Sequence, residues 1–142
     1  MFSHLDYSFT CEHPDGSAPI VGKTPGYGGE DLRRQLAFLR RFLEDNEVWT
    51  LRPANEVFAQ VAGELDGLAR ADHGRLYLFY LPASTPGRTV SVNLHPGTYR
   101  LEWVNPVTCR VTHAETINVA SSFHRITTPP WEGDVAFRCA RT

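Results

Sequence analysis

Residues 94–111, LHPGTYRLEWVNPVTCRV, carry the clearest structural signal in this chain of 142 residues. A Pro-Gly pair and an Asn-Pro pair mark turns on either side of a short run of alternating side chains. Within the run, Tyr99, Leu101 and Trp103 alternate with mostly polar neighbours, as in a strand that buries one face and shows the other to water. We therefore predict that Trp103 fills a core between two sheets. The alternative is that Trp103 is a platform on which a ligand such as a sugar ring stacks.

The alternation continues on both sides of this stretch and indicates an all-β region from about residue 73 onward. In the run at 108–113 it predicts a face made of Cys109, Val111 and His113. Short strands at this spacing favour a mainly β fold, an antiparallel β-sandwich with an N-terminal strand and helix segment packed on it. The predicted strands cover residues 74–82, 88–94, 97–105, 108–113 and 134–140.

One run breaks the alternation, because residues 76–81, LYLFYL, are apolar or aromatic on both faces, and both faces should therefore be buried. Upstream, a helix is predicted from Glu30 to about residue 44, with acidic residues in its first turn. Its leucine stripe needs an apolar surface, and we expect the stripe to pack on the strand at 76–81. A weaker helical turn is predicted at 54–61. The stripe consists of Leu32, Leu36, Leu39 and Leu43.

Composition bounds the domain organisation and the class of partner. We divide the chain into an N-terminal segment, residues 1–63, and a β-sandwich domain, residues 64–142. The formal charge of -2 gives no basic footprint for a nucleic acid. No apolar run approaches the ~20 residues that cross a bilayer, so no membrane partner is predicted. The first residues also lack the charged and apolar regions of a signal peptide.

The cysteines and histidines show no metal or redox motif. The chain has an odd number of cysteines, and their spacings match neither a metal nor a redox motif. They are Cys11, Cys109 and Cys139. We predict buried free thiols rather than the alternative, a disulfide between Cys109 and Cys139. The compartment is not decided by this pattern. The histidines of the β region lie on separate segments without ligand spacing, so we predict no metal site and no cofactor. They are His95, His113 and His124.

Carboxylates cluster near the N-terminus, in LDYSFTCEHPDG. Asp6, Glu12 and Asp15 are the candidates for the acid and base of a hydrolase. The simpler interpretation is that Asp15 and the glycine after it form a turn, and that the other two are solvated loop residues. We favour the turn, and we expect this chain alone to hydrolyse nothing.

Two further tryptophans, Trp49 and Trp131, lie beside prolines or in a loop. Either could be half exposed and stack on a sugar, which makes them the candidate ligand-binding residues. Plugging the ends of the sandwich is the interpretation that we favour for both.

A family resemblance rests on three motifs in the β region. They are a YLP strand, then GTYRLEWVNP with its turn, then PPWEGD before the last strand. These motifs resemble the C-terminal β-sandwich that follows the (β/α)8 barrel in glycoside-hydrolase-like proteins, a domain named for collagen binding in a collagenase. The part upstream, LDYSFTCEHPDG and the helix after PGYGG, resembles the last strand, loop and helix of such a barrel. The resemblance covers nearly the whole chain.

The resemblance implies a non-catalytic accessory module that supports a catalytic barrel or docks on a carbohydrate or matrix surface. The alternatives are a carbohydrate-binding module that uses an exposed tryptophan, and a part of an active glycoside hydrolase whose remaining barrel is on a missing segment or a partner chain. A barrel takes roughly 250 residues, so this chain has room for only its last unit. An isolated barrel strand would expose its edge, and a homodimer would hide that edge. The parent proteins are implied to be secreted.

Overall fold

The computed structural model describes residues 10–19, 29–59, 67–84, 87–130 and 133–142. The chain divides into two compact units, Met1–Glu44 and Asp45–Thr142, and each is considered by itself. None of the described helices is both long and apolar enough to span a membrane.

Among the described residues of the N-terminal unit there is one helix, α1 (Gly29–Asp45), whose last residue belongs to the second unit. It confirms the helix predicted from Glu30. Glu30 and Asp31 lie in its first turn, where negative charge complements the helix dipole. Within the leucine stripe, Leu36 and Leu39 are about half exposed, at 55% and 49%. Packing of this stripe on the strand at 76–81 stays a prediction.

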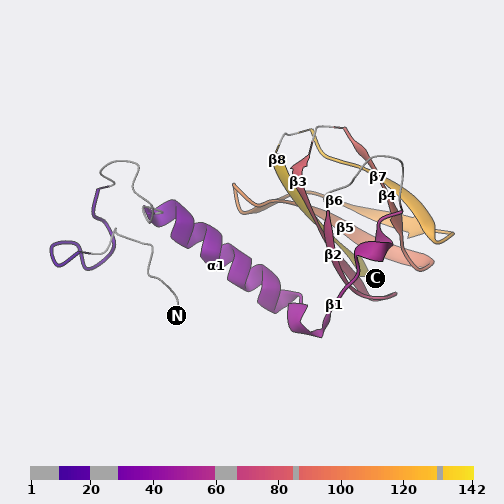
Figure 1. Ribbon diagram of the computed structural model, residues 1–142, viewed down its shortest axis with the longest axis horizontal. Coiled ribbons are helices and arrows are strands. Elements are labelled where there is room, and N and C mark those ends of the chain that lie inside the picture. Colours follow the sequence, from indigo (N-terminus) through magenta and orange to yellow (C-terminus); the bar gives the residue numbers. More distant parts are fainter. Residues whose placement is uncertain (1–9, 20–28, 60–66, 85–86, 131–132) are drawn as a thin grey trace. The chain divides into compact units, whose positions relative to one another are not determined.

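The second unit is built from two antiparallel sheets (Figure 1), so the predicted mainly β fold is confirmed. The larger sheet has the strand order β1-β2-β3-β8-β5-β6, and the smaller sheet pairs β4 with β7. The strands are β1 (Arg52–Pro53), β2 (Leu68–Asp72), β3 (Leu76–Ser84), β4 (Thr89–Asn93), β5 (Gly97–Asn105), β6 (Arg110–Val119), β7 (Phe123–Thr127) and β8 (Gly133–Arg141).

Two short 3-10 turns flank β1: η1 (Val48–Thr50) precedes it, and η2 (Asn55–Val57) lies between β1 and β2. The helical turn predicted at 54–61 is therefore limited to η2, and residues 60 and 61 lie outside the described part. Phe58 follows η2 and forms an isolated antiparallel bridge with Val92 of β4. The Asn55 side chain also accepts a hydrogen bond from the Ala69 amide, which fixes η2 against β2.

The core lies between the two sheets, and β5 supplies its largest side chain. Trp103 is only 2% exposed and packs on Phe137 of β8 at 4.6 Å between ring centroids. Phe137 in turn stacks on Phe79 of β3 at 4.4 Å. Val90 and Ile126 of the smaller sheet belong to the same buried cluster, so residues from both sheets share one core. The prediction that Trp103 is a core residue is confirmed.

Strand β3 is buried on both faces, as its doubly apolar sequence predicts. Tyr77 and Phe79 point into the core, where they are 0% and 3% exposed. Leu76 and Leu78, on the opposite face, are also buried, at 5% and 8%. In register, Leu78 lies between Arg70 of β2 and Arg138 of β8. The aliphatic stems of long side chains cover apolar neighbours well in such positions.

Strand β6 contradicts the predicted face of Cys109, Val111 and His113. Cys109 lies before the strand with a left-handed φ of 59°, and Val111 and His113 are exposed. A bulge also shifts the register, since Trp103 pairs with His113 whereas Val104 pairs with Val111, which leaves one extra residue on β6. The bulge turns Val111 to the other face. Because β6 is the last strand of its sheet, the prediction of a common buried face was wrong.

All three cysteines are free thiols, so the alternative of a disulfide between Cys109 and Cys139 is wrong. Cys139 is buried in the core, and burial raises the pKa of its thiol to about 12. Cys11 is exposed and Cys109 is half-buried, so the prediction that the free thiols are buried is correct only for Cys139.

Candidate functional site

Two of the candidate acids near the N-terminus, Glu12 and Asp15, lie in turns. Glu12 and Asp15 are both exposed, and the Gly16 amide closes the turn by donating to the His13 carbonyl at 3.1 Å. Asp15 accepts a hydrogen bond from the Ser17 amide at 3.1 Å. Hydrogen bonds from Ser17, through its hydroxyl first and its amide second, lower the pKa of the Asp15 carboxyl. A carboxyl group with a lowered pKa is a poor proton donor at neutral pH. Asp6 lies outside the described residues.

Another carboxylate, Glu102 on the outer face of the larger sheet, serves an ion-pair network. Its Oε1 accepts a hydrogen bond from Arg100 Nε at 2.9 Å, along the same strand. Arg138 Nε of β8 lies 3.2 Å from Glu102 Oε2. The two groups form an ion pair, but they are not aligned for a hydrogen bond. Of these two contacts, only the Glu102–Arg138 pair crosses strands. Glu102 therefore has a structural role.

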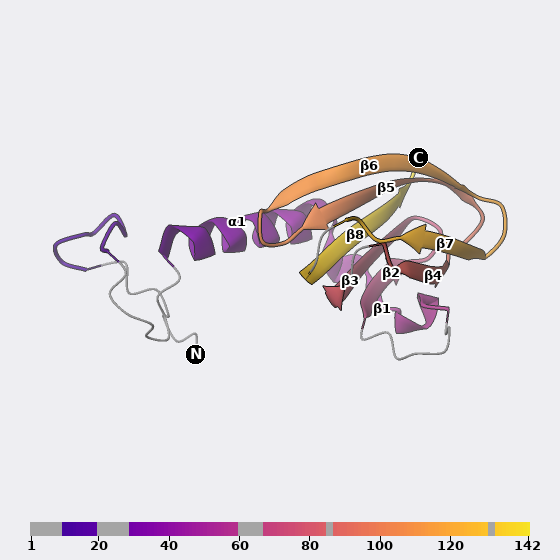
Figure 2. The same cartoon turned by 90° about the horizontal axis from the view of Figure 1, so that it is seen from above.

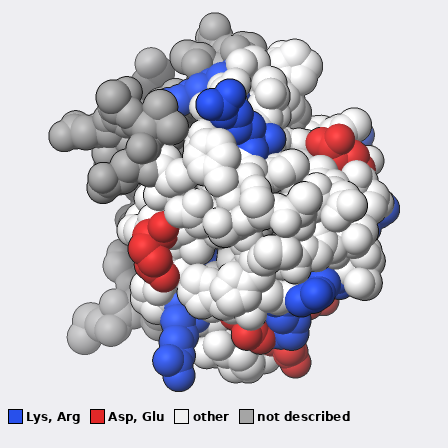
Figure 3. Space-filling view, turned by 90° about the vertical axis from the view of Figure 1, so that its right-hand side faces the viewer, with Lys and Arg blue, Asp and Glu red and all other residues white. Residues whose placement is uncertain are grey.

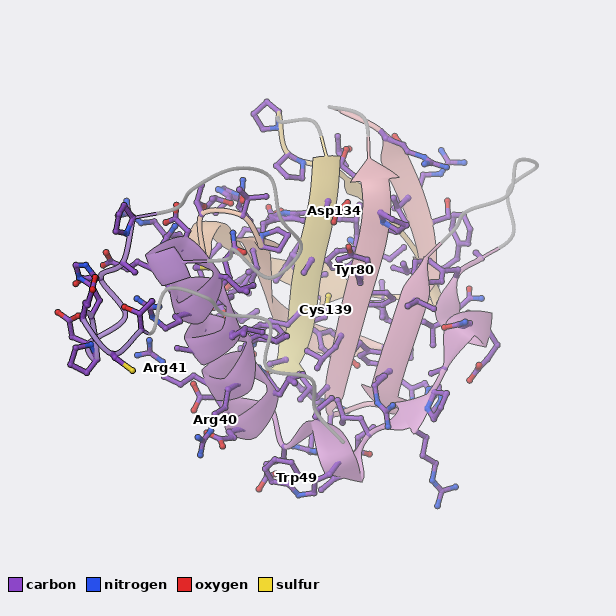
Figure 4. All side chains as sticks on the ribbon, turned by 60° about the vertical axis from the view of Figure 1, so that its left-hand side comes forward. Arg40, Arg41, Trp49, Tyr80, Asp134 and Cys139 are labelled. Atoms are coloured by element: carbon purple, nitrogen blue, oxygen red, sulfur yellow. The ribbon has the colours of Figure 1, made fainter. Side chains whose placement is uncertain are left out.

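Trp49 is the most exposed large apolar side chain among the described residues, at 67%. It lies on η1, outside the strands of the sheet (Figure 4). The prediction that Trp49 plugs an end of the sandwich is wrong, because plugging would bury the indole. The other candidate platform, Trp131, lies outside the described residues.

The turn that carries Trp49 is fixed from both sides. Glu47 precedes it in a left-handed conformation, with φ 45° and ψ 46°, which is uncommon for a residue other than glycine. The Glu47 carbonyl accepts hydrogen bonds from the Thr50 amide and hydroxyl, at 2.8 and 2.9 Å. Leu51, only 2% exposed, anchors the turn, and its carbonyl accepts from Arg70 at 2.6 Å. The backbone of Trp49 is thus held in place while its ring faces water.

Polar groups lie beside this turn. Arg75, from the β2–β3 connection, donates to the Thr50 hydroxyl at 3.4 Å and pairs with Asp72 at 2.5 Å. The two charged side chains are about half exposed, so they can still bind other groups. An exposed indole next to paired donors and acceptors is suited to a sugar, because the ring stacks on its C–H face and the polar groups bind hydroxyls. We call Trp49, Thr50, Asp72 and Arg75 the Trp49 surface.

A histidine pair near this surface had no signal in the sequence. His73 and His95 stack with ring centroids 5.6 Å apart, and Glu56 Oε1 lies 3.6 Å from His73 Nε2. The Tyr77 hydroxyl ties their loops together, accepting from the amides of Gly74 and His95 at 2.9 and 3.1 Å. The pair could be found only by knowing that the β2–β3 turn and the β4–β5 loop meet at one end of the sandwich.

On the face drawn in Figure 3, acidic and basic side chains are few and mixed. Within the described ranges there is also no group of three or more His, Cys, Asp or Glu side chains that could hold a metal ion. The exposed indole is therefore the most distinctive chemical feature of this unit.

Two solved structures share the fold of this chain. A chain named "Glycoside hydrolase" matches with a TM-score of 0.63 and 15% identity, over 85% of this chain and 28% of that one. A glycoside hydrolase family 5 structure from Bacteroides vulgatus matches with a TM-score of 0.61 and 15% identity, over 87% of this chain and 29% of that one. This chain thus spans less than a third of either neighbour. No family model and no curated protein matches the sequence.

Proposed function

We propose that this chain is a non-catalytic β-sandwich module of a glycoside-hydrolase-like protein, where it supports a catalytic domain. The observation that carries the proposal is the coverage of the fold match, in which most of this chain corresponds to 28–29% of chains named as glycoside hydrolases. The remaining length of such a chain is enough to hold a catalytic scaffold. The exposed positions of Glu12 and Asp15 support a non-catalytic role, since glycoside hydrolysis needs two carboxyl groups roughly 5–10 Å apart across a cleft.

The test is an activity assay on the purified chain. Aryl glycosides and plant polysaccharides should give no turnover above a blank. Turnover that disappears in Glu12→Gln or Asp6→Asn would contradict the proposal and favour an active hydrolase whose barrel is completed by another segment or chain.

A second function is favoured by one observation, the 67% exposure of Trp49 on a rigid turn. The same module would then dock on carbohydrate through the Trp49 surface. Stacking on an aromatic face is insensitive to salt, unlike attraction between exposed charges. Asp72 and Arg75 neutralise each other, so neutral glycans fit this surface better than acidic ones.

A pull-down with neutral and acidic polysaccharides tests this docking function. Binding should survive high salt and disappear in Trp49→Ala. Val107→Ala is the matched control, because Val107 is similarly exposed, at 64%, but lies on the β5–β6 turn. Collagen belongs in the same panel as the matrix ligand that the family resemblance names. Binding lost at modest salt, or unchanged in Trp49→Ala, would contradict docking through this surface.

A further inference from the structure

The free edge of β6 presents an ordered row of backbone groups. In the described part of the larger sheet β6 is the terminal strand, as seen along the top of Figure 2. The Thr98 carbonyl of β5 accepts a hydrogen bond from the amide of Thr142, the residue that follows β8. The backbone groups of Thr98 therefore point toward the β8 side. In an antiparallel ladder the N–H and C=O of one residue point to the same side, and successive residues alternate. The backbone N–H and C=O groups of Tyr99, Leu101 and Trp103 therefore point toward β6.

The register transfers this pattern to β6. Tyr99, Leu101 and Trp103 pair with three residues of β6, and these exchange their backbone hydrogen bonds with β5. They are Ile117, Glu115 and His113. The residues between and after them, Ala114, Thr116 and Asn118, consequently direct their N–H and C=O groups away from β5.

This edge lacks most of the usual protection against pairing. Proteins commonly protect an edge strand with lysine, proline or a bulge. Strand β6, RVTHAETINV, contains no lysine and no proline, and its charged residues are Arg110 and Glu115. Its bulge lies at Thr112, between the pairs His113–Trp103 and Val111–Val104, and leaves residues 113–119 in regular register. Thr116 and Asn118 are also exposed.

We propose that a second copy of this chain pairs with β6, antiparallel and about a two-fold axis through Thr116. Thr116 then exchanges two hydrogen bonds with the partner's Thr116. Ala114 and Asn118 exchange theirs with the partner's Asn118 and the partner's Ala114. All three outward residues are used in this register and the bulge is left outside. The two six-stranded sheets become one continuous sheet, and the β6 edge of each copy becomes paired.

Side chains across the axis support a second copy as the occupant. Directly opposed threonines form a favourable cross-strand pair, and Glu115 faces the uncharged Ile117 of the partner subunit, so no like charges are opposed. A register centred one residue earlier would oppose Glu115 to the partner's Glu115, which like charges disfavour. The antiparallel arrangement also places the first residues of β6 in one copy beside the last residues of β6 in the other copy.

Sedimentation equilibrium of the full chain over a wide range of concentrations tests the proposal. The weight-average mass should rise toward that of a dimer with concentration. Thr116→Pro should hold it at half that value, because proline removes an outward N–H and is tolerated on the solvent side of an edge strand. Thr116→Val, which keeps the N–H, should still dimerise. A monomer at every concentration, or a dimer that Thr116→Pro leaves intact, overturns the proposal.

Cysteine crosslinking tests the register even if Thr116→Pro fails to fold. In a background with Cys11→Ser and Cys109→Ser, Thr116→Cys should form a disulfide-linked dimer on mild oxidation. Opposed residues of a hydrogen-bonded pair have Cα atoms about 5.5 Å apart, a distance that a disulfide accepts. Asn118→Cys is the matched control, because it faces the partner's Ala114 and should give no crosslink. Equal crosslinking of the two variants would overturn the two-fold register.

Discussion

Strands β5 and β6 are hydrogen-bonded neighbours with similar alternating sequences, yet their environments differ. On β5, Tyr99, Leu101 and Trp103 are at most 2% exposed. The residues paired with Leu101 and Trp103, which are Glu115 and His113 of β6, are both exposed. The same face of one sheet is thus core on one strand and surface on the next.

The difference lies in what each strand has around it. Strand β5 is flanked by β8 and β6, and its inner face contributes to the core that the smaller sheet shares. Strand β6 has one neighbour in its sheet, and of its residues only Val119 is fully buried. A period of two in the sequence identifies a strand, but the position of the strand within the sheet decides how much of its face is buried.

The largest effect is expected at Trp103. Replacement by alanine should lower the free energy of unfolding by roughly 3–5 kcal/mol, because it removes the largest core side chain and leaves a cavity. Urea unfolding followed by circular dichroism measures the change. An unchanged midpoint would show that β5 is no more central to the core than β6.

Alkaline pH should lower the free energy of unfolding through Cys139, a core residue of β8 that pairs with Leu101 of β5. The ordinary thiol pKa of 9.0 is raised to about 12 in the folded chain, so the unfolded state loses its proton first. The stabilisation is complete below pH 9 and is lost as the pH rises toward 12, at about 1.4 kcal/mol for each pH unit.

Unfolding by urea at successive alkaline pH values measures this slope. Cys139→Ala should flatten this slope. The slope that remains belongs to two tyrosines: burial raises the pKa of Tyr99, and a hydrogen bond to Asp134 raises the pKa of Tyr80. A slope that Cys139→Ala leaves unaltered would mean that this thiol is not buried.

A smaller effect is expected at His113 of β6, the residue that pairs with Trp103. His113→Ala should change the free energy of unfolding by no more than about 0.5 kcal/mol, as for most exposed positions. Thermal melts of His113→Ala and Trp103→Ala at one protein concentration compare the two strands directly. Similar losses in both variants would refute the contrast between β5 and β6.

The smallest effect on stability is expected at Trp49, because its ring is mostly in water. Trp49→Ala should melt within the error of the parent chain, whereas tryptophan fluorescence should lose its most solvent-exposed contribution. A clear loss of stability would show that the indole is packed against something and is not a free platform.

Much of the fold follows from local pattern. The helix at Glu30, the core position of Trp103 and the double burial of Leu76 and Leu78 each depend on periodicity within one segment. The errors concern what periodicity does not contain. The exposure of Val111 depends on a bulge and on the place of β6 at the edge. Burial of Trp49 was predicted from its apolar character, and its exposure depends on where the turn after Glu47 lies.

The last strand has a consequence for biosynthesis. Strand β8 lies between β3 and β5, although about fifty residues separate it from β3 in the chain. On a ribosome, β3 and β5 emerge first, and neither can complete its ladder until residues 133–141 have been made. Contacts between segments so distant in sequence form slowly, and unpaired strands are prone to aggregate while they wait. A nascent chain therefore has two open strands where the finished sheet has its centre.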